Sequence, residues 1–462
     1  MKALGGRSAG SHGRRRIVAL AVVGALVVGA VALAATASAG KKTHTAKAPT
    51  AKNVIVMISD GCGYNHMLAT DYYQYGRTGK QVYQKFPVRV GMSTYSVFGG
   101  YDPRLAWKSF DYVKSGATDS ASAATAMSTG YKTYDAAIGV DVNKQALYNV
   151  SQRAEALGKS SGVVTSVQWS HATPAGYVAH NESRNNYAQL AQEMIDDSMT
   201  DVIMGAGHPQ FDNNGRPAAN SYKYVGDLVT WNALKAGTAG GDADGDGIAD
   251  PWTLIETEAD FAALTVGTTP KRVCGTAQVY STLQQSRGGG DKADPYDVPL
   301  NTDVPDLVTM TRGALNVLDN DTDGFVLMVE GGAVDWAGHA NQSGRLIEEE
   351  IDFNRSVEAV CRWIEKNSSW DETLLVVTGD HETGYLWGPG SDPTWRPIVN
   401  KGKGNVPGMQ WNSGDHTNSL IPFYAKGAGA KQLRKQADER DFRRGRYMDN
   451  TELGKVVFEL LK

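Results

Sequence analysis

The stretch Asn53–Asp60, NVIVMISD, decides the fold class that this 462-residue sequence predicts. Apolar residues follow one another from Val54 to Ile58, with no alternation between polar and apolar positions. Such a run is typical of a strand that is buried on both faces, as in a parallel sheet covered by helices. An aspartate follows at once, at the end of a strand where open parallel sheets bind ligands. The stretch therefore predicts a buried strand over Asn53–Ser59 with an acid, Asp60, at its carboxyl end.

Other short runs rich in β-branched residues predict further strands of the same sheet. They are Gly162–Gln168, Asp201–Met204, Gly324–Val329, Thr373–Thr378 and Leu420–Ala425. Helical patterns alternate with them over Lys144–Lys159, Asn186–Asp197, Asp306–Asp319, Arg345–Lys366 and Thr451–Leu461. This alternation predicts an α/β fold, with a large, mostly parallel central sheet flanked by helices on both faces. The range 205–303 is less periodic and rich in Gly, Asn and Asp, so we expect it to be a surface insertion.

Residues 1–39 have the composition of an export signal. Basic residues at 2, 7 and 14–16 precede an apolar stretch over 17–35, and Ala37-Ser38-Ala39 has the pattern of a cleavage site. The signal is of the Sec type or, given the arginines at 14–16, of the twin-arginine type. The apolar stretch is also long enough to span a bilayer, so an uncleaved anchor is the alternative. We expect cleavage after Ala39, a secreted protein, a flexible leader over 40–52 and one catalytic domain over 53–462.

The charge balance bears on the class of partner. The chain has 46 Lys and Arg against 50 Asp and Glu, and removal of residues 1–39 changes its net charge from −4 to about −9. A protein of this charge is not expected to bind nucleic acid through its overall field. The three cysteines, Cys62, Cys274 and Cys361, allow at most one disulfide, and we predict none.

Residue types that bind metals follow four of the predicted strands. Asp60 follows the strand that starts at Asn53, and His171 and Thr173 follow the strand Gly162–Gln168. Glu330, Asp335 and His339 follow the strand Gly324–Val329, and Asp380 and His381 follow the strand Thr373–Thr378. Each of these residues alone has an ordinary explanation as a turn or a surface residue. Together they would repel one another at one edge of the sheet unless cations neutralised them. Mixed Asp and His sets suit zinc, and all-oxygen sets suit magnesium.

Six motifs, in their order and spacing, resemble the alkaline phosphatases. They are SDGCG (59–63), TDSASAATAMSTG (118–130), HATPAGYVAHNESR (171–184), VEGGAVDWAGH (329–339), GDHETG (379–384) and GDHTN (414–418). The resemblance implies a metal-dependent hydrolase of phosphate monoesters that works through a phosphoserine intermediate. Its substrates would be small molecules, and the family pattern also implies a possible homodimer.

The resemblance also implies a role for each matching residue. Asp60, Asp380 and His381 would hold one zinc, Asp335, His339 and His416 a second, and Asp60, Thr173 and Glu330 a third metal, usually magnesium. Ser120 would be the nucleophile, Arg184 would bind the phosphate, and Asp119 would position Arg184. From the residues alone, Asp119 and Ser120 predict only an ordinary helix cap before an Ala-rich helix.

Two positions depart from the pattern of many bacterial members, which carry an acid and a lysine there. This chain has His171 and Trp336 instead. His171 would bring an imidazole near the third metal, and Trp336 would remove a cation near the phosphate. The resemblance therefore implies a third metal that is zinc or cobalt, or magnesium bound more weakly.

Two acidic stretches support a different class of function, a secreted calcium-binding protein. Residues 319–330 fit the EF-hand loop pattern, but FVLMV within them predicts a buried strand and Glu330 is already assigned to the metal site. Asp242, Asp244, Asp246 and Asp250 form a second loop, which we expect to be either a structural calcium site or a solvated acidic turn. A phosphodiesterase or a sulfatase on a similar sheet is the enzymatic alternative.

Overall fold

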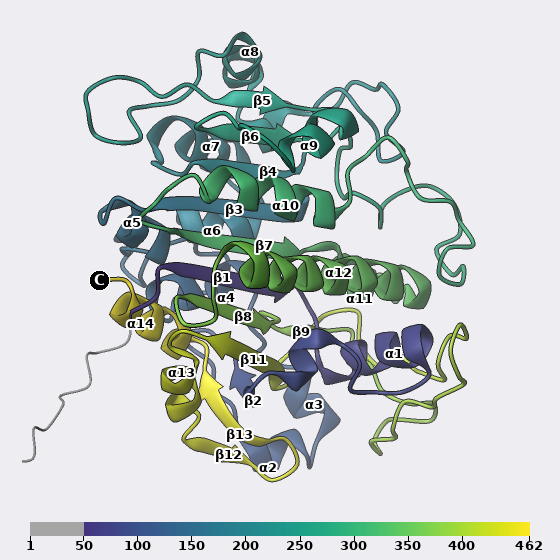
Figure 1. Ribbon diagram of the computed structural model, residues 1–462. Helices are drawn as coiled ribbons and strands as arrows, with labels where there is room; N and C mark the ends of the chain where they lie inside the picture. The colour runs from purple at the N-terminus through teal and green to yellow at the C-terminus, as the bar shows by residue number, and fades with distance from the viewer. Residues whose placement is uncertain (1–49) are drawn as a thin grey trace, which may run out of the picture. The chain divides into compact units, whose positions relative to one another are not determined.

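An eleven-stranded sheet forms the centre of the computed structural model, which describes residues 50–462 (Figure 1). Its strand order is β12-β13-β2-β11-β8-β1-β7-β3-β4-β6-β5. The strands are β1 (Asn53–Ser59), β2 (Val88–Ser93), β3 (Ser160–Gln168), β4 (Val202–Ala206), β5 (Thr253–Ile255), β6 (Val273–Thr276), β7 (Phe325–Gly331), β8 (Thr373–Thr378), β11 (Ile421–Gly427), β12 (Glu439–Asp441) and β13 (Gly445–Asp449). Most neighbouring strands are parallel, and the antiparallel pairs are β11 with β2, β11 with β8, and β12 with β13. The predicted mostly parallel sheet is confirmed.

The predicted export signal, residues 1–39, and positions 40–49 of the predicted leader lie outside the described residues. Among residues 50–462, no helix has both the length and the apolar character needed to cross a bilayer.

Helices cover both faces of the sheet, as the sequence predicts (Figure 1). They are α1 (Tyr64–Tyr75), α2 (Pro103–Ala106), α3 (Phe110–Val113), α4 (Ser120–Thr129), α5 (Val150–Glu155), α6 (Ala172–Val178), α7 (Tyr187–Gln192), α8 (Leu228–Ala236), α9 (Glu258–Leu264), α10 (Leu307–Leu318), α11 (Ala333–His339), α12 (Ser343–Asn367), α13 (Ala430–Gln436) and α14 (Thr451–Leu460). The two largest hydrophobic clusters among the described residues contain α4, α6 and α14 in one case and α1, α10 and α12 in the other. A small third cluster includes residues of α2 and α3.

Strand β1 shows why its sequence does not alternate. Val54, Val56 and Ile58 pack into the cluster with α4, whereas Ile55 and Met57 pack into the cluster with α12. Because successive side chains of a strand point to opposite faces, a strand between two helical layers needs apolar residues at both parities. All seven residues of β1 are buried.

Several regions differ from the sequence prediction. Strands β2, β12 and β13 were not predicted, and the helix expected over Asn186–Asp197 is α7 followed by a π-helical turn over Glu193–Asp197. Two further regions show why. The helix expected over Lys144–Lys159 is only α5, because Asn149 caps it in a capping box with Gln152 and Lys144 has a positive φ of 63°. The range 205–303, expected as a surface insertion, contains β6 and β5, which pair with β4 and with each other and extend the sheet at one edge. Short strands of three or four residues leave too few positions for a periodic signal.

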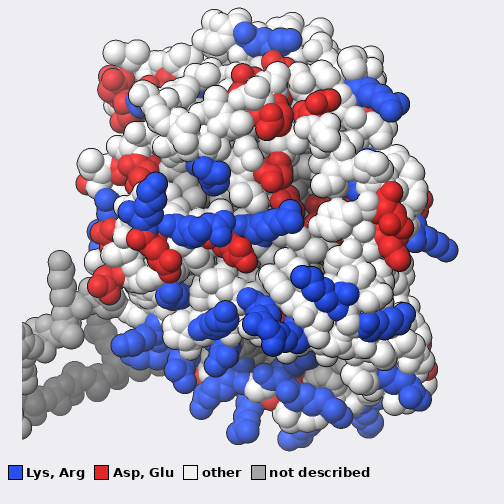
Figure 2. Space-filling view, turned by 45° about the vertical axis from the view of Figure 1, so that its right-hand side comes forward, with Lys and Arg blue, Asp and Glu red and all other residues white. Residues whose placement is uncertain are grey.

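Charge is distributed unevenly over the described surface. Figure 2 shows Lys and Arg gathered over the lower part of one face, the end of the molecule where Figure 1 places β12 and β13. Exposed Arg440, Arg443 and Arg446 belong to this hairpin. The net charge of −4 therefore describes the chain but not each of its faces.

Several acidic residues of helix α12 are buried, and Glu349 is one whose pKa is raised far above its ordinary value. Its Oε1 has no hydrogen-bond partner among the described residues. Burial, followed by the charges of Asp352 and Glu348, raises the pKa of Glu349 to about 8. The native state then keeps a proton that the unfolded state loses above about pH 4.5. Stability therefore falls as pH rises from that value and levels off above pH 8.

We expect Glu349→Gln, which cannot ionise, to remove this loss. Its stability advantage over the wild type should grow by on the order of 2–4 kcal/mol between pH 5 and pH 9. Urea unfolding at both pH values, with the same added zinc, measures it. Glu365→Gln, on the exposed side of the same helix, is the matched control and should show no such growth. An equal difference at both pH values for Glu349→Gln would contradict the prediction.

Candidate active site

The parallel strands bring the predicted ligands to one edge of the sheet. Ile58 of β1 is paired with Glu330 of β7 and with Thr378 of β8. Asp60 lies two residues after Ile58, and Asp380 lies two residues after Thr378. The two aspartates therefore lie side by side just beyond the ends of β1 and β8. His171 and Thr173 follow β3, which pairs with β7 on its other side. Residues from four strand ends thus share one edge, as the sequence predicts.

The remaining ligand candidates come from α11 and β10. Helix α11 starts just after β7 and carries Asp335 and His339 back over the edge. Strand β10 (His416–Thr417) pairs with β9 (Glu382–Thr383), which follows Asp380 and His381, and so places His416 beside His381. The rings of His381 and His416 stack with their centroids 3.6 Å apart.

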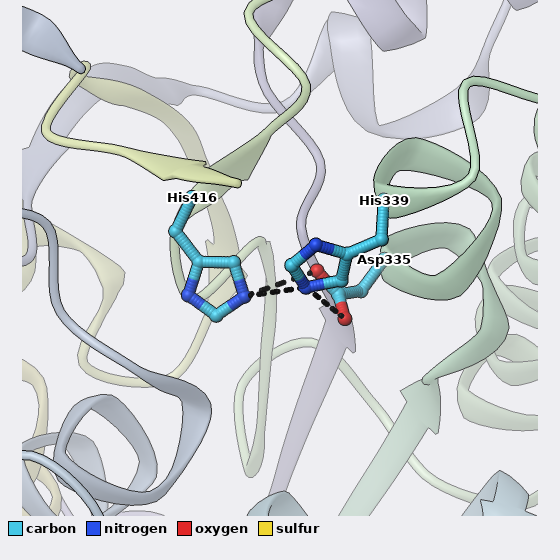
Figure 3. A group of neighbouring side chains, drawn as sticks. All are labelled: Asp335, His339 and His416. Carbon is cyan, nitrogen blue, oxygen red and sulfur yellow. Dashed lines mark hydrogen bonds and ion pairs between the residues drawn. The ribbon is translucent and has the colours of Figure 1, made fainter. Parts of the chain in front are cut away.

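Asp335, His339 and His416 form the first group of convergent ligand atoms (Figure 3). The Nε2 atoms of both histidines lie 3.4 Å from oxygens of Asp335 and 3.0 Å from each other. The Nδ1 atoms lie 2.6 Å from the Gly414 carbonyl and 2.9 Å from the Thr118 carbonyl. A carbonyl can only accept, so each Nδ1 carries a proton, and in the neutral imidazole each Nε2 is then the lone-pair donor. Two lone pairs facing one carboxylate fit a cation such as zinc.

Asp60, Asp335 and His381 form the second group. His381 Nε2 lies 3.5 Å from Asp60 Oδ1 and 3.3 Å from Asp380 Oδ2. Asp380 Oδ1 accepts hydrogen bonds from the backbone N–H groups of Gly61 and His381, which leaves its Oδ2 without a hydrogen-bond partner in the described chain. Asp335 therefore belongs to both groups, which the motifs alone do not indicate. This group also fits a cation with mixed nitrogen and oxygen ligands.

A third set consists of buried oxygens without hydrogen-bond partners among the described residues. They are Asp60 Oδ1, Thr173 Oγ1 and Glu330 Oε1. The other oxygen of Glu330 accepts a hydrogen bond from Thr165 Oγ1. Buried polar atoms without partners are costly, and an all-oxygen set of this kind fits magnesium.

Burial also shifts the pKa values of the carboxyl groups at this edge of the sheet. Burial, followed by the charges of Asp380, Asp335 and Glu330, raises the pKa of Asp60 well above its ordinary value. Burial raises the pKa of Glu330 to about 7 and that of Asp380 to about 6. A bound cation would stabilise the ionised carboxylates and lower these pKa values again.

Asp335 and His416 shift in the opposite sense. Burial alone would raise the pKa of Asp335, but the hydrogen-bonded His416 and the nearby His339 and His381 lower it. Burial alone would lower the pKa of His416, but Asp335 raises it to about 9. Without a cation, the two side chains form an ion pair in its place.

Ser120 is the first residue of α4 and is buried beside the second group. Its Oγ lies 3.2 Å from His381 Nε2. Asp119 is the N-cap, and its Oδ1 accepts the Ser122 N–H at 3.0 Å. Its Oδ2 accepts a hydrogen bond from Arg184 Nη1 at 2.9 Å. Asp119 therefore caps the helix and also holds Arg184, so the helix-cap reading and the functional reading are both compatible with the geometry.

The electrostatics of the Asp119–Arg184 pair favour its ionised form. Burial alone would raise the pKa of Asp119, but Arg184 and the N–H groups of Ser122 and Ala136 lower it below its ordinary value. An open pocket of about 380 Å³ is lined by Ser120, Arg184, Asp335, His339 and His416 among others. The serine, the arginine and both histidines of the first group therefore reach one common space.

His171 and Trp336 lie beside the ligand groups. Their rings are 5.7 Å apart, and Tyr187 lies parallel to His171 at 6.0 Å. His171 Nδ1 is buried without a hydrogen-bond partner in the described residues. Burial, followed by the charge of Arg184, lowers the pKa of His171 to about 3, so its imidazole is neutral and able to bind a metal.

The Asp242 loop lies apart from this pocket. Oxygens of Asp242, Asp244 and Asp246 converge, and all three side chains are exposed. Lys271 donates to Asp244 at 2.7 Å and to Asp250 at 2.8 Å, so two of the four predicted calcium ligands share an ammonium partner. The calcium site stays a prediction. In the other acidic stretch, Phe325–Gly331 is strand β7, as the sequence predicts.

Two supporting residues were not found by sequence reasoning. Thr383 Oγ1 donates to Asp335 Oδ1 at 2.5 Å, and Thr165 donates to Glu330. Thr383 lies within the motif GDHETG, which could have indicated it. Thr165 lies in the middle of a buried strand and has no such signal.

Comparisons with known proteins agree with this geometry. A family model described as "Alkaline phosphatase" matches residues 51–443. Alkaline phosphatase 3 of Bacillus subtilis is 30% identical over 72% of this chain, and the match spans 61% of that protein. Alkaline phosphatase 4 of the same organism is 28% identical over 75% of this chain, and the match spans 77% of that protein. The solved alkaline phosphatase of the Antarctic bacterium TAB5 is 25% identical, with a TM-score of 0.63 over 89% of this chain and 98% of that structure.

Proposed function

Because the chain belongs to the alkaline phosphatase family, we propose that it hydrolyses phosphate monoesters through a phosphoserine intermediate on Ser120. One observation carries the proposal. The Oγ of Ser120 lies 3.2 Å from His381 Nε2, at a pocket that Arg184 and the group of Asp335, His339 and His416 also line. A nucleophile, a phosphate-binding cation and metal ligands thus meet in one place, as phosphoryl transfer requires.

The family resemblance, together with the ligand groups, gives the proposed metal content. Two zinc ions would be held by Asp60, Asp380 and His381, and by Asp335, His339 and His416. Asp60, Thr173 and Glu330 would hold a magnesium ion. Neutral His171, and the lack of a cationic side chain at Trp336, favour zinc or cobalt in place of magnesium. When bound, the zinc ions activate the serine hydroxyl and neutralise charge on the reacting phosphate. Supporting this content are the inward-facing Nε2 atoms and the unpartnered buried oxygens.

The chain's own residues perform the steps around the phosphorus atom. Arg184 binds two non-bridging oxygens through its planar guanidinium, and Asp119 keeps that guanidinium in place. The N-terminal amides of α4 favour the bound phosphate. Ser120 Oγ attacks phosphorus, the bond to the leaving alcohol breaks, and phosphoserine forms. Water then attacks the same phosphorus atom, the bond to Oγ breaks, and inorganic phosphate leaves.

The location and the assembly are parts of the same proposal. The basic residues, the apolar stretch and the Ala37-Ser38-Ala39 site support export by a Sec or twin-arginine route, giving a secreted protein. The family pattern supports a homodimer, which sedimentation velocity of the purified protein tests directly.

A substrate panel with metal analysis tests the proposed function. We expect the purified protein to hydrolyse phenyl phosphate at alkaline pH, to contain about two zinc ions per chain, and to lose activity in chelator. Faster hydrolysis of a diester or of an aryl sulfate would replace the proposal by the phosphodiesterase or the sulfatase. Calcium-dependent stability without hydrolysis of any ester would favour the calcium-binding alternative.

Arg184 gives a prediction about substrate binding rather than bond breaking. Arg184→Ala should raise KM and the inhibition constant of inorganic phosphate roughly 10- to 100-fold, because two charge-assisted hydrogen bonds are lost. Arg184→Lys should recover only part of this, since an ammonium cannot bind two oxygens in a planar fork. Steady-state kinetics with phosphate as inhibitor measure both variants.

Asp119→Asn is the companion variant. It keeps an oxygen for the Ser122 N–H but loses the charge that holds Arg184, so we expect a smaller rise in the same constants and retained turnover. Complete inactivity of Asp119→Asn would show that its role is misassigned.

A further inference from the structure

The pocket that holds Ser120 has acids at its mouth. Of the ten described residues that line it, Arg184 is the one lysine or arginine. Asp135 and Asp415 also line it, and both are exposed. Lys223, which lies over the rings of Tyr187 and Tyr224, is not among the lining residues. The pocket thus has a phosphate-binding end and a negatively charged mouth.

Asp135 is fixed to the phosphate-binding pair through its own side chain and through the next residue. Its Oδ1 accepts a hydrogen bond from Ser122 Oγ at 3.2 Å. Ala136 donates its N–H to Asp119 Oδ1 at 3.0 Å and accepts the Arg184 N–H at 2.7 Å. Ala136 has a φ of 72°, a left-handed conformation that is unfavourable for alanine and persists only when surrounding contacts hold it. The Asp135 carboxylate therefore lies beside the Asp119–Arg184 pair that we propose binds the phosphate.

Asp415 lies next to the first ligand group. It directly precedes His416, its N–H donates to Ser413 Oγ at 2.9 Å, and its carbonyl accepts the Gly384 N–H at 3.0 Å. Its backbone is thus tied to the segment that follows His381. The two rim acids come from separate parts of the chain, one beside Arg184 and the other beside His416.

We propose that Asp135 and Asp415 make this site select phosphate monoesters whose alcohol carries a positive charge, such as esters of amino alcohols. The inference rests on the proposed phosphatase function. With the phosphate held by Arg184, the alcohol part of the ester extends toward the open mouth, where a cation meets two carboxylates and an anion is repelled. A carboxylate about 8 Å from a cation in water changes binding roughly two-fold, so two of them change it about five-fold.

Phosphocholine and 3,3-dimethylbutyl phosphate form the matched probe pair. They have nearly the same shape, and only the first carries a charge in its alcohol, at every pH. The measured quantity is the ratio of kcat/KM for phosphocholine to kcat/KM for the neutral ester. Differences in leaving-group chemistry cancel when this ratio is compared between variants. The charge of the alcohol should change kcat/KM, because the alcohol is bound only until phosphoserine has formed and has left before phosphoserine is hydrolysed.

We expect the ratio to fall about two-fold in Asp135→Asn and in Asp415→Asn, and about five-fold in the double variant. The amide oxygen in Asp135→Asn would still accept the Ser122 hydrogen bond, so the loop geometry is kept. Asp371→Asn is the charge-matched control, because Asp371 is exposed and precedes β8 at the opposite edge of the sheet, and its ratio should not change. In 0.5 M salt the wild-type preference should shrink, because the Debye length is then only about 4 Å.

An unchanged ratio in the double variant, with both esters still hydrolysed, would overturn the inference and leave the proposed function intact. A wild-type protein that hydrolyses neither ester nor phenyl phosphate would instead refute the proposed function, and the inference with it. The two failures are therefore distinguishable within one set of assays.

Discussion

Ser120→Ala is expected to lower kcat/KM for phenyl phosphate by on the order of 10³-fold or more. Ser120 Oγ is the hydroxyl that lies 3.2 Å from His381 Nε2 at the start of α4, and alanine leaves no atom to attack phosphorus. Some activity should remain, because Arg184 and metal ions bound at the site would still hold the phosphate. Steady-state kinetics measure the loss. Acid quenching with labelled phosphate should trap phosphoserine in the wild type and none in the variant.

Ser115→Ala is the matched control for this variant. Ser115 is exposed, lies just before the same helix and is not among the residues that line the pocket. It should keep the activity and the phosphate label of the wild type. Undiminished turnover in Ser120→Ala, or a label on another residue of the wild type, would mean that Ser120 is not the nucleophile.

Asp335→Asn is expected to remove zinc from the protein and to lower kcat/KM by a similarly large factor. Oxygens of Asp335 lie 3.4 Å from the Nε2 atoms of His339 and His416, and the same side chain belongs to the group with Asp60 and His381. Asparagine offers a neutral oxygen in place of the charge. Residues that only support a ligand change metal affinity roughly 10- to 100-fold, so a ligand shared by two groups should matter more.

Metal content after dialysis measures this effect, with kinetics before and after adding zinc. We expect the variant to lose at least about one zinc ion per chain, and the wild type treated with chelator to lose activity that zinc restores. Asp371→Asn again serves as the control for loss of one negative charge. An Asp335→Asn protein that keeps its full zinc content and activity would contradict the assignment of Asp335 to the metal centre.

Much of the fold could be predicted from local sequence. Strands β1 and β8 have the bounds that their apolar runs predict, Asn53–Ser59 and Thr373–Thr378. Both are buried on both faces, so their composition records the environment directly. The sustained helical period over Arg345–Lys366 predicted a helix, and the structure has α12 over Ser343–Asn367. Strands β5 and β6 are too short to show a period and were missed.

The candidate site divides in the same way. The ligand types at the strand ends could be predicted, because parallel strands end at one edge and because the motifs have a specific order. That Asp335 belongs to two groups could not be predicted, nor could the left-handed Ala136 between Asp119 and Arg184. Both depend on contacts between residues that are far apart in the chain.

The sequence by itself determined which chemistry this protein carries: a serine at a helix start, an arginine, and acids and histidines after buried strands. Only the tertiary structure decided how these groups face one another. His416 Nδ1 reaches the Thr118 carbonyl across 298 positions of the chain, and that contact aims Nε2 at His339. Local periodicity reflects which side of a strand or helix is buried, but the distance between such remote residues is set by how the elements pack.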